Sequence, residues 1–114
     1  MTDSLVKKYI PMTETTYYTL LAVIIPRHGY AIMQFVKQLT QGRICLGTGT
    51  LYTMVGRLVD DEMIQIVSEE GGRKTYQITE MGRSFLEQET SRLANQLENG
   101  REILLQGGGK AEEN

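Results

Sequence analysis

Residues 46–74 read LGTGTLYTMVGRLVDDEMIQIVSEEGGRK, and this stretch decides the fold. Leu51, Val55 and Leu58 recur at the spacing of one helical face, which predicts a helix that is buried on that side. The side chains between them are mostly polar, so the opposite face of this helix is free to enter a groove. After Met63 the apolar period changes from that of a helix to that of a strand.

A β-hairpin is therefore expected after this helix. Ile64 and Ile66 alternate with polar residues, as in a half-buried strand. The sequence EGGR at residues 70–73 signals a tight turn, and residues 75–79 alternate again. A helix followed by a hairpin is the order of elements in a winged helix-turn-helix. The expected fold class is mainly α with a small β-hairpin.

Two more helices are expected ahead of this stretch. Thr13 is the expected N-cap of the first helix, and Pro26 is expected to end it, because proline disfavours the helical region for the residue before it. The second helix is expected over residues 30–40, with a stop at Gln41-Gly42. Residues 1–12 are expected to form a loosely held arm. Residues 1–79 together form the expected DNA-binding domain.

A long helix is expected over residues 80–105, after the hairpin. Four of its leucines lie seven, four and seven residues apart: Leu86, Leu93, Leu97 and Leu104. This heptad-like spacing predicts a dimer contact, and the competing interpretation is packing on their own domain. The glycine-rich end, residues 106–114, is expected to be a disordered tail.

Composition restricts the class of protein. The chain has 114 residues, which suits one domain, and small domains gain from a core shared in a dimer. No apolar run approaches the length of a membrane span, and the first residues lack the apolar core of a signal peptide. The single cysteine agrees with a reducing compartment. We therefore expect a cytoplasmic protein with no membrane partner.

The distribution of charge matters more than the net charge of −2. Residues 27–57 contain four bases and no acid, whereas residues 58–72 contain five acids and no base. Arg73 and Lys74 then stand together at the expected hairpin tip. The helix expected to face a groove thus lies in an acid-free segment, and the hairpin ends in a basic pair, which favours nucleic acid as a partner.

Several segments together resemble the PadR family of bacterial transcriptional regulators. They are GTGTLYTMVGRL, GGRK, TYQITEMGRSFL, PRHGYAIMQFV and YIPMTETTYYTLLAVI, and the resemblance extends from Tyr9 to Leu104. Two departures are Glu62-Met63-Ile64, where the family often has a glycine, and Thr53, where many members have a proline. The chain also lacks the tryptophan on which drug-binding relatives build a stacking pocket.

The resemblance implies a winged helix-turn-helix homodimer that binds double-stranded operator DNA, usually as a repressor. It implies dimerisation of the last helix against the partner's N-terminal helix, which adds Tyr17 to the expected dimer residues. Some members respond to small aromatic effectors, so such a molecule is a candidate ligand. Carried over residue by residue, Thr50, Leu51 and Tyr52 match the start of the recognition helix, Arg57 and Leu58 its Arg-Leu pair, Arg73 and Lys74 the wing, and Thr79 and Gly82 the opening of the last helix.

The expected DNA-binding residues are Thr48, Gly49, Thr50, Tyr52, Thr53, Arg57, Arg73 and Lys74. Tyr52 lies off the apolar face, so we favour a hydroxyl contact to phosphate over a place in the core. Arg57 has two interpretations, a phosphate contact or an ion pair with Asp60 or Asp61. We favour a backbone or minor-groove contact for the wing bases over simple solvation.

Other functions receive less support. His28 has no companion ligands, so we expect a structural role, no metal site and no cofactor. Cys45 is expected to be a small buried hydrophobe, with a thiol sensor as the alternative. No nucleophile–base–acid set or nucleotide loop is visible, so we expect no enzyme. The remaining alternatives are a winged-helix protein-interaction module, which the negative net charge supports, and a ligand sensor that does not itself bind DNA.

Overall fold

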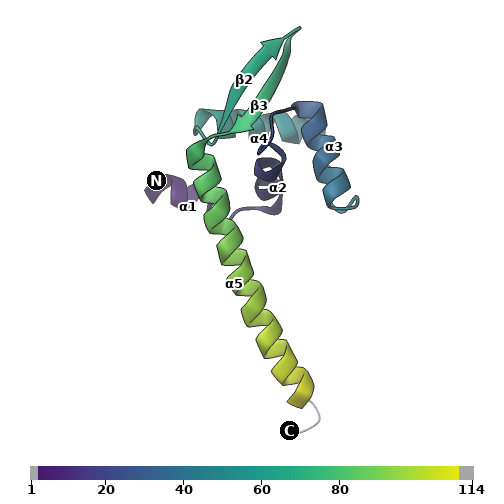
Figure 1. The fold of residues 1–114 in the computed structure, drawn as a ribbon, viewed down its shortest axis with the longest axis vertical. Coiled ribbons are helices and arrows are strands. Elements are labelled where there is room, and N and C mark those ends of the chain that lie inside the picture. Colours follow the sequence, from purple (N-terminus) through teal and green to yellow (C-terminus); the bar gives the residue numbers. More distant parts are fainter. Residues whose placement is uncertain (1–2, 111–114) are drawn as a thin grey trace.

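The computed structural model describes residues 3–110, which form five helices and a small three-stranded antiparallel sheet. The elements are α1 (Asp3–Tyr9), α2 (Glu14–Ala22), β1 (Arg27–His28), α3 (Gly29–Leu39), α4 (Thr48–Asp60), β2 (Ile64–Glu70), β3 (Arg73–Ile78) and α5 (Glu80–Lys110). Figure 1 shows the hairpin of β2 and β3 projecting from one end and α5 running away toward the other. The expected fold class, mainly α with a small β-hairpin, is confirmed.

One hydrophobic core joins α2, α3, α4, the sheet and the start of α5. Leu20, Ile32, Leu51 and Leu58 are completely buried, as the helical spacing predicts for α4. Phe85, in the second turn of α5, is also completely buried, so the first turns of the last helix belong to this core. We call residues 3–93 the head.

The hairpin forms at the expected turn. Gly71 and Gly72 have φ values of +59° and +75°, and positive φ at both central residues is what a two-residue hairpin turn of this kind requires. A third strand, β1, was not expected from the sequence: it pairs with β3 through Arg27↔Tyr76 and His28↔Thr75. Two residues are too short to show an alternating pattern, so only the tertiary fold reveals this strand.

The boundaries of α2 agree with expectation at its start and differ at its end. Thr13 caps α2 as predicted, since its side chain accepts a hydrogen bond from the Thr16 amide at 3.1 Å. However, α2 ends at Ala22 and not at Pro26, because the Val23 carbonyl leaves the helix and accepts from the Ile78 amide at 2.8 Å. Gly47 is the N-cap of α4.

The expected loose arm is wrong for its described part, because residues 3–9 form α1. Tyr9 is only 4 % exposed and meets the edge of Phe85, with ring centroids 6.5 Å apart. Its hydroxyl donates to an Asp61 carboxylate oxygen at 2.5 Å, at the C-terminal end of α4. The aromatic burial of Tyr9 is the physical reason that this segment is held.

The last helix is continuous and reaches beyond its expected end. It continues through Gly100 and through residues 106–110, which were expected to begin a disordered tail. Each glycine costs a helix only about 1 kcal/mol, so no single position stops it. Residues 111–114 of the expected tail lie outside the described residues. We call residues 94–110 the distal arm. None of the helices within residues 3–110 is long and apolar enough to span a membrane.

Candidate nucleic-acid interface

The outer face of α4 carries the expected groove-facing residues. Leu51, Met54, Val55 and Leu58 turn inward and are buried. The six expected contact residues of this helix are all exposed: Thr48, Gly49, Thr50, Tyr52, Thr53 and Arg57. The helix therefore presents a polar surface, free of acid from Thr48 to Val59, to anything that approaches the head from this side.

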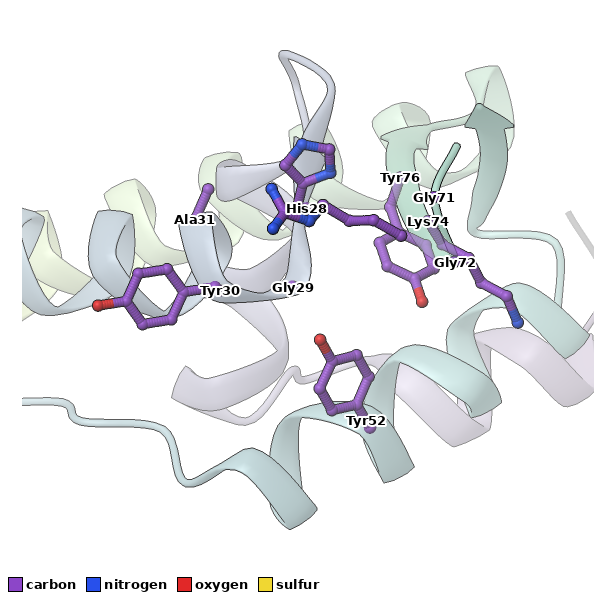
Figure 2. Close-up of a pocket in the computed structure, with 10 residues that line it drawn as sticks. His28, Gly29, Tyr30, Ala31, Tyr52, Gly71, Gly72, Lys74 and Tyr76 are labelled. Carbon is purple, nitrogen blue, oxygen red and sulfur yellow. The ribbon is translucent and has the colours of Figure 1, made fainter. Parts of the chain in front are cut away.

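A cleft of about 600 Å³ lies between the start of α3, the middle of α4 and the hairpin. We call it the phenol cleft, because the Tyr52 and Tyr76 hydroxyls point into the same open space in Figure 2. Gly29 closes one side, and a side chain at this position would overlap the Tyr52 ring. The absence of a side chain at Gly29 therefore leaves room for the Tyr52 ring, which is 47 % exposed.

Hydrogen-bond donors and two basic side chains line the phenol cleft, and acids on the facing strand balance the charge of these bases. Burial, with lesser contributions from Tyr52 and Glu69, raises the pKa of Tyr76, so its hydroxyl remains a donor at neutral pH. Arg73 and Lys74 line the cleft from the wing. The strand register places Glu70 opposite Arg73 and Glu69 opposite Lys74. An acid thus faces each base, although no ion pair within 4.0 Å forms between them in the described part of the chain.

Arg57 does not form the expected alternative ion pair with Asp60 or Asp61. Its guanidinium instead lies 6.0 Å from the centre of the Tyr9 ring. Asp61 is bound by Lys8, whose Nζ is 2.7 Å from the carboxylate, and by the Tyr9 hydroxyl. These two donors lower the pKa of Asp61 and keep it ionised.

His28 makes the kind of structural contact that was expected, whereas Cys45 is not buried as expected. Nδ1 of His28 lies 3.1 Å from Oγ1 of Thr75, where it links β1 to β3, as a structural role requires. Cys45 is exposed and not buried, because it lies in the extended segment between α3 and α4. Within residues 3–110 there is no group of three or more potential metal-ligating side chains.

The expected dimer residues fall into two groups. Leu86 is 4 % exposed and packs in its own head, which removes it from the expected contact. The Tyr17 hydroxyl forms a hydrogen bond of 2.7 Å with the Thr90 hydroxyl of α5 in the same chain. Leu97 and Leu104, by contrast, are 54 % and 76 % exposed on the distal arm. Leu93 is half-buried, so the accessible part of the leucine series begins there and increases toward Leu104.

Sequence reasoning missed Gly29 and Tyr76 in the phenol cleft. The alternation of residues 75–79 predicts only a strand for Tyr76, whose ring is buried while its hydroxyl faces the cleft. Nothing local in the sequence marks Gly29 as a neighbour of Tyr52, since their proximity depends on the packing of α3 on α4. The acids opposite the wing bases were available from the sequence, by counting outward from the turn.

The protein-family model described as the transcriptional regulator PadR-like family matches residues 19–88. This range holds α3, α4, the hairpin and the start of α5, and therefore both sides of the phenol cleft.

Among curated proteins, the Escherichia coli transcriptional regulator YqjI is 36 % identical over 61 residues, which are 54 % of this chain and 30 % of that protein. A Lysinibacillus sphaericus protein described as uncharacterized is 36 % identical over 64 residues, or 53 % of this chain and 59 % of its own length. The chain thus matches less than a third of the length of YqjI.

Solved structures share the arrangement over nearly the whole chain. A PadR-like transcription factor from Bacteroides fragilis is 26 % identical with a TM-score of 0.64, covering 89 % of this chain and 99 % of that one. RosR from Halobacterium salinarum has a TM-score of 0.65 at 15 % identity, covering 86 % and 94 % of the two chains. The second likeness concerns the fold alone.

Proposed function

The chain belongs to the PadR-like family of transcriptional regulators, and we propose that it represses transcription as a homodimer bound to a pseudo-palindromic operator. The family consists of DNA-binding regulators and not of enzymes. One observation carries the proposal: the acid-free, exposed face of α4 adjoins a cleft lined by three tyrosines and by Arg73 and Lys74.

In this proposal α4 enters the major groove of one half-site. Thr48, Gly49, Thr50 and Thr53 are short enough to let the helix approach base edges, and the threonine hydroxyl groups both donate and accept there. Tyr52 and Tyr76 donate to the neighbouring backbone phosphate, and Lys74 adds a cation beside it. Phosphate contacts of this kind fix the position of the head, whereas the threonines of α4 supply sequence preference.

The homodimer forms through the distal arm in this proposal. Its exposed leucines and Ile103 have no cover within the described chain, and a second copy supplies the same surface. Two heads would then meet half-sites about 34 Å apart, one turn of DNA. A small aromatic effector would bind between the heads and the two long helices and change that spacing.

Fluorescence anisotropy tests the proposal. A labelled duplex from the region upstream of the gene is compared with a scrambled duplex at several salt concentrations. The expected result is saturable preference for the upstream duplex, with affinity that falls steeply as salt rises. Equally feeble binding to both duplexes by a folded dimer, followed by failure to enrich any sequence from a random library, would favour the protein-interaction module.

The effector is tested separately by melting the protein with a panel of small aromatic compounds. A ligand at one hundred times its Kd stabilises the folded state by about 2.7 kcal/mol. A compound that both raises the melting temperature and releases the upstream duplex would support the effector. Compounds that raise the melting temperature of a protein with no affinity for DNA would support the ligand sensor instead.

A further inference from the structure

A second cleft lies along α4, on the flank away from the wing. It encloses about 520 Å³ between the start of α2 and the exposed face of α4. Thr13 and Thr15 border it on α2, and Thr50, Thr53 and Arg57 border it on α4. None of these residues borders the phenol cleft, so α4 has a separate hollow on each side.

Arg57 is the one charged side chain that lines this threonine cleft. It makes no ion pair within 4.0 Å to any acid of the described residues. Glu14, the acid beside Thr13 in the sequence, is held away by Arg43 at 2.9 Å. The cleft therefore combines a guanidinium that forms no close ion pair with several hydroxyl groups and no lining carboxylate, a composition suited to an oxyanion, and Asp61 acts on Arg57 only at longer range.

The absence of an Arg57 ion pair has a structural cause. Asp61, the C-cap of α4, follows Arg57 by four residues, and opposite charges at this spacing ordinarily pair on a helix. Lys8 of α1 occupies its carboxylate at 2.7 Å, and Tyr9 donates to the same oxygen at 2.5 Å. Asp61 thus has two donors already, and Arg57 rests over the Tyr9 ring instead.

We propose that the threonine cleft binds a backbone phosphate of duplex DNA through Arg57 and its neighbouring hydroxyls, and that Lys8 keeps Arg57 available by holding Asp61. The inference rests on the proposed function, because it supposes that α4 enters a major groove. A helix with its side chains is roughly 10–12 Å wide and the groove about 12 Å, so phosphates of both strands flank the helix. The phenol cleft would meet one strand and the threonine cleft the other.

Salt titration of a non-specific duplex tests the Arg57 contact without knowledge of the operator, since phosphate contacts do not depend on sequence. Arg57→Gln is expected to weaken binding roughly tenfold at low salt and to reduce the slope of log affinity against log salt by about 1 for each site engaged. Arg101→Gln removes the same charge from the distal arm and is expected to leave the slope unchanged. Arg57→Lys is expected to retain most of the slope.

Two outcomes separate this inference from the proposed function. If Arg57→Gln keeps the wild-type affinity and slope while Lys74→Gln lowers both, the threonine cleft does not bind phosphate, and the DNA-binding regulator stands. If the folded wild-type protein binds no duplex even at low salt, the proposed function fails and this inference fails with it.

The role of Lys8 is tested by rescue. Lys8→Ala frees Asp61 to capture Arg57, so DNA binding is expected to weaken several-fold more than in Lys7→Ala, which removes the adjacent charge of the same helix. Asp61→Asn in the Lys8→Ala background is expected to restore most of the loss. Asp60→Asn in that background removes an equal negative charge one residue away and is the matched control.

Equal effects of Lys7→Ala and Lys8→Ala, or equal rescue by Asp60→Asn and Asp61→Asn, would overturn the role of Lys8. Either result would mean that only the total charge near the duplex matters. Melting curves of every variant show whether the head remains folded, and Asp61→Asn with Lys8 intact shows what loss of the carboxylate alone does to binding.

Discussion

The head and the distal arm differ in how far their apolar side chains are buried, although α5 runs through both. In the head all five helices and strands β2 and β3 contribute to a single core, and Phe85 of α5 is completely buried within it. Along the distal arm no side chain of residues 94–107 is buried, and Leu104 and Leu105 are 76 % and 78 % exposed. The head thus buries a core of apolar side chains within one chain, whereas the apolar side chains of the distal arm remain exposed among the described residues.

The largest effect is expected from the core of the head. Phe85→Ala removes a completely buried ring and should lower the free energy of unfolding by about 3–5 kcal/mol. Ile103→Ala, on the distal arm, should cost almost nothing in a dilute monomeric sample, because that residue is 62 % exposed. Urea titration of both variants below the dimer dissociation constant measures the contrast. Similar losses from the two would mean that the arm is covered within one chain.

The junction between the two regions depends on Glu89. This carboxylate is 1 % exposed, accepts from the Met12 amide at 3.0 Å and pairs with Arg92 at 2.7 Å. Glu89→Ala leaves the Met12 amide without its partner and should cost about 3 kcal/mol, at the lower end for a broken buried pair since Arg92 remains partly in water. Chemical denaturation gives the value, with Glu87→Ala, which loses only an exposed pair, as the control.

Glu89 also predicts a pH dependence. The hydrogen bond from Arg92 lowers the pKa of Glu89 in the folded protein below its ordinary value of about 4.3. The stabilisation is therefore complete above the ordinary value and is lost as the pH falls through the folded pKa. Stability should decline more steeply in acid for the wild type than for Glu89→Gln. Parallel acid denaturation curves for the two proteins would contradict the attribution of this pH dependence to Glu89.

The distal arm itself is tested by a double change, Leu97→Ser with Leu104→Ser. We expect loss of the dimer in sedimentation velocity with little change in the stability of the head, because both residues are exposed in the single chain. The melting temperature should also cease to depend on protein concentration. A Leu86→Ser variant would instead unfold the head. A double variant that remains dimeric would place the interface elsewhere.

Within the head, the smallest expected effect comes from Tyr9→Phe. The change keeps the ring against Phe85 and removes only the hydroxyl that donates to Asp61, so the cost should be about 1 kcal/mol. The same hydroxyl has a pKa raised to about 12 by burial and by Asp61. Its ultraviolet titration should therefore be delayed relative to the exposed tyrosines, and the delayed component should disappear in Tyr9→Phe.

Local features of the fold could be predicted from the sequence, and tertiary ones could not. The buried face of α4, the cap at Thr13 and the turn at Gly71-Gly72 each depend on residues a few positions apart. The strand β1, by contrast, exists only because β3 lies beside it, and α1 is held because Tyr9 finds Phe85 and Asp61 far along the chain.

The candidate site divides in the same way. The exposed residues of α4 and the basic wing tip could be read from periodicity and charge. The phenol cleft could not, because it depends on how closely α3 packs against α4. Leu86 shows the limit of a spacing argument, since a heptad-like series does not reveal which of its leucines the head has already buried.

The single exposed thiol of Cys45 has a practical consequence. The chain has no other cysteine, and this one lies in the segment just before α4. A maleimide spin label would therefore attach at one position in each subunit, next to the helix that we expect to enter the groove. In a dimer, the separation of two such labels by pulsed electron paramagnetic resonance would report the distance between the two heads directly, with and without DNA.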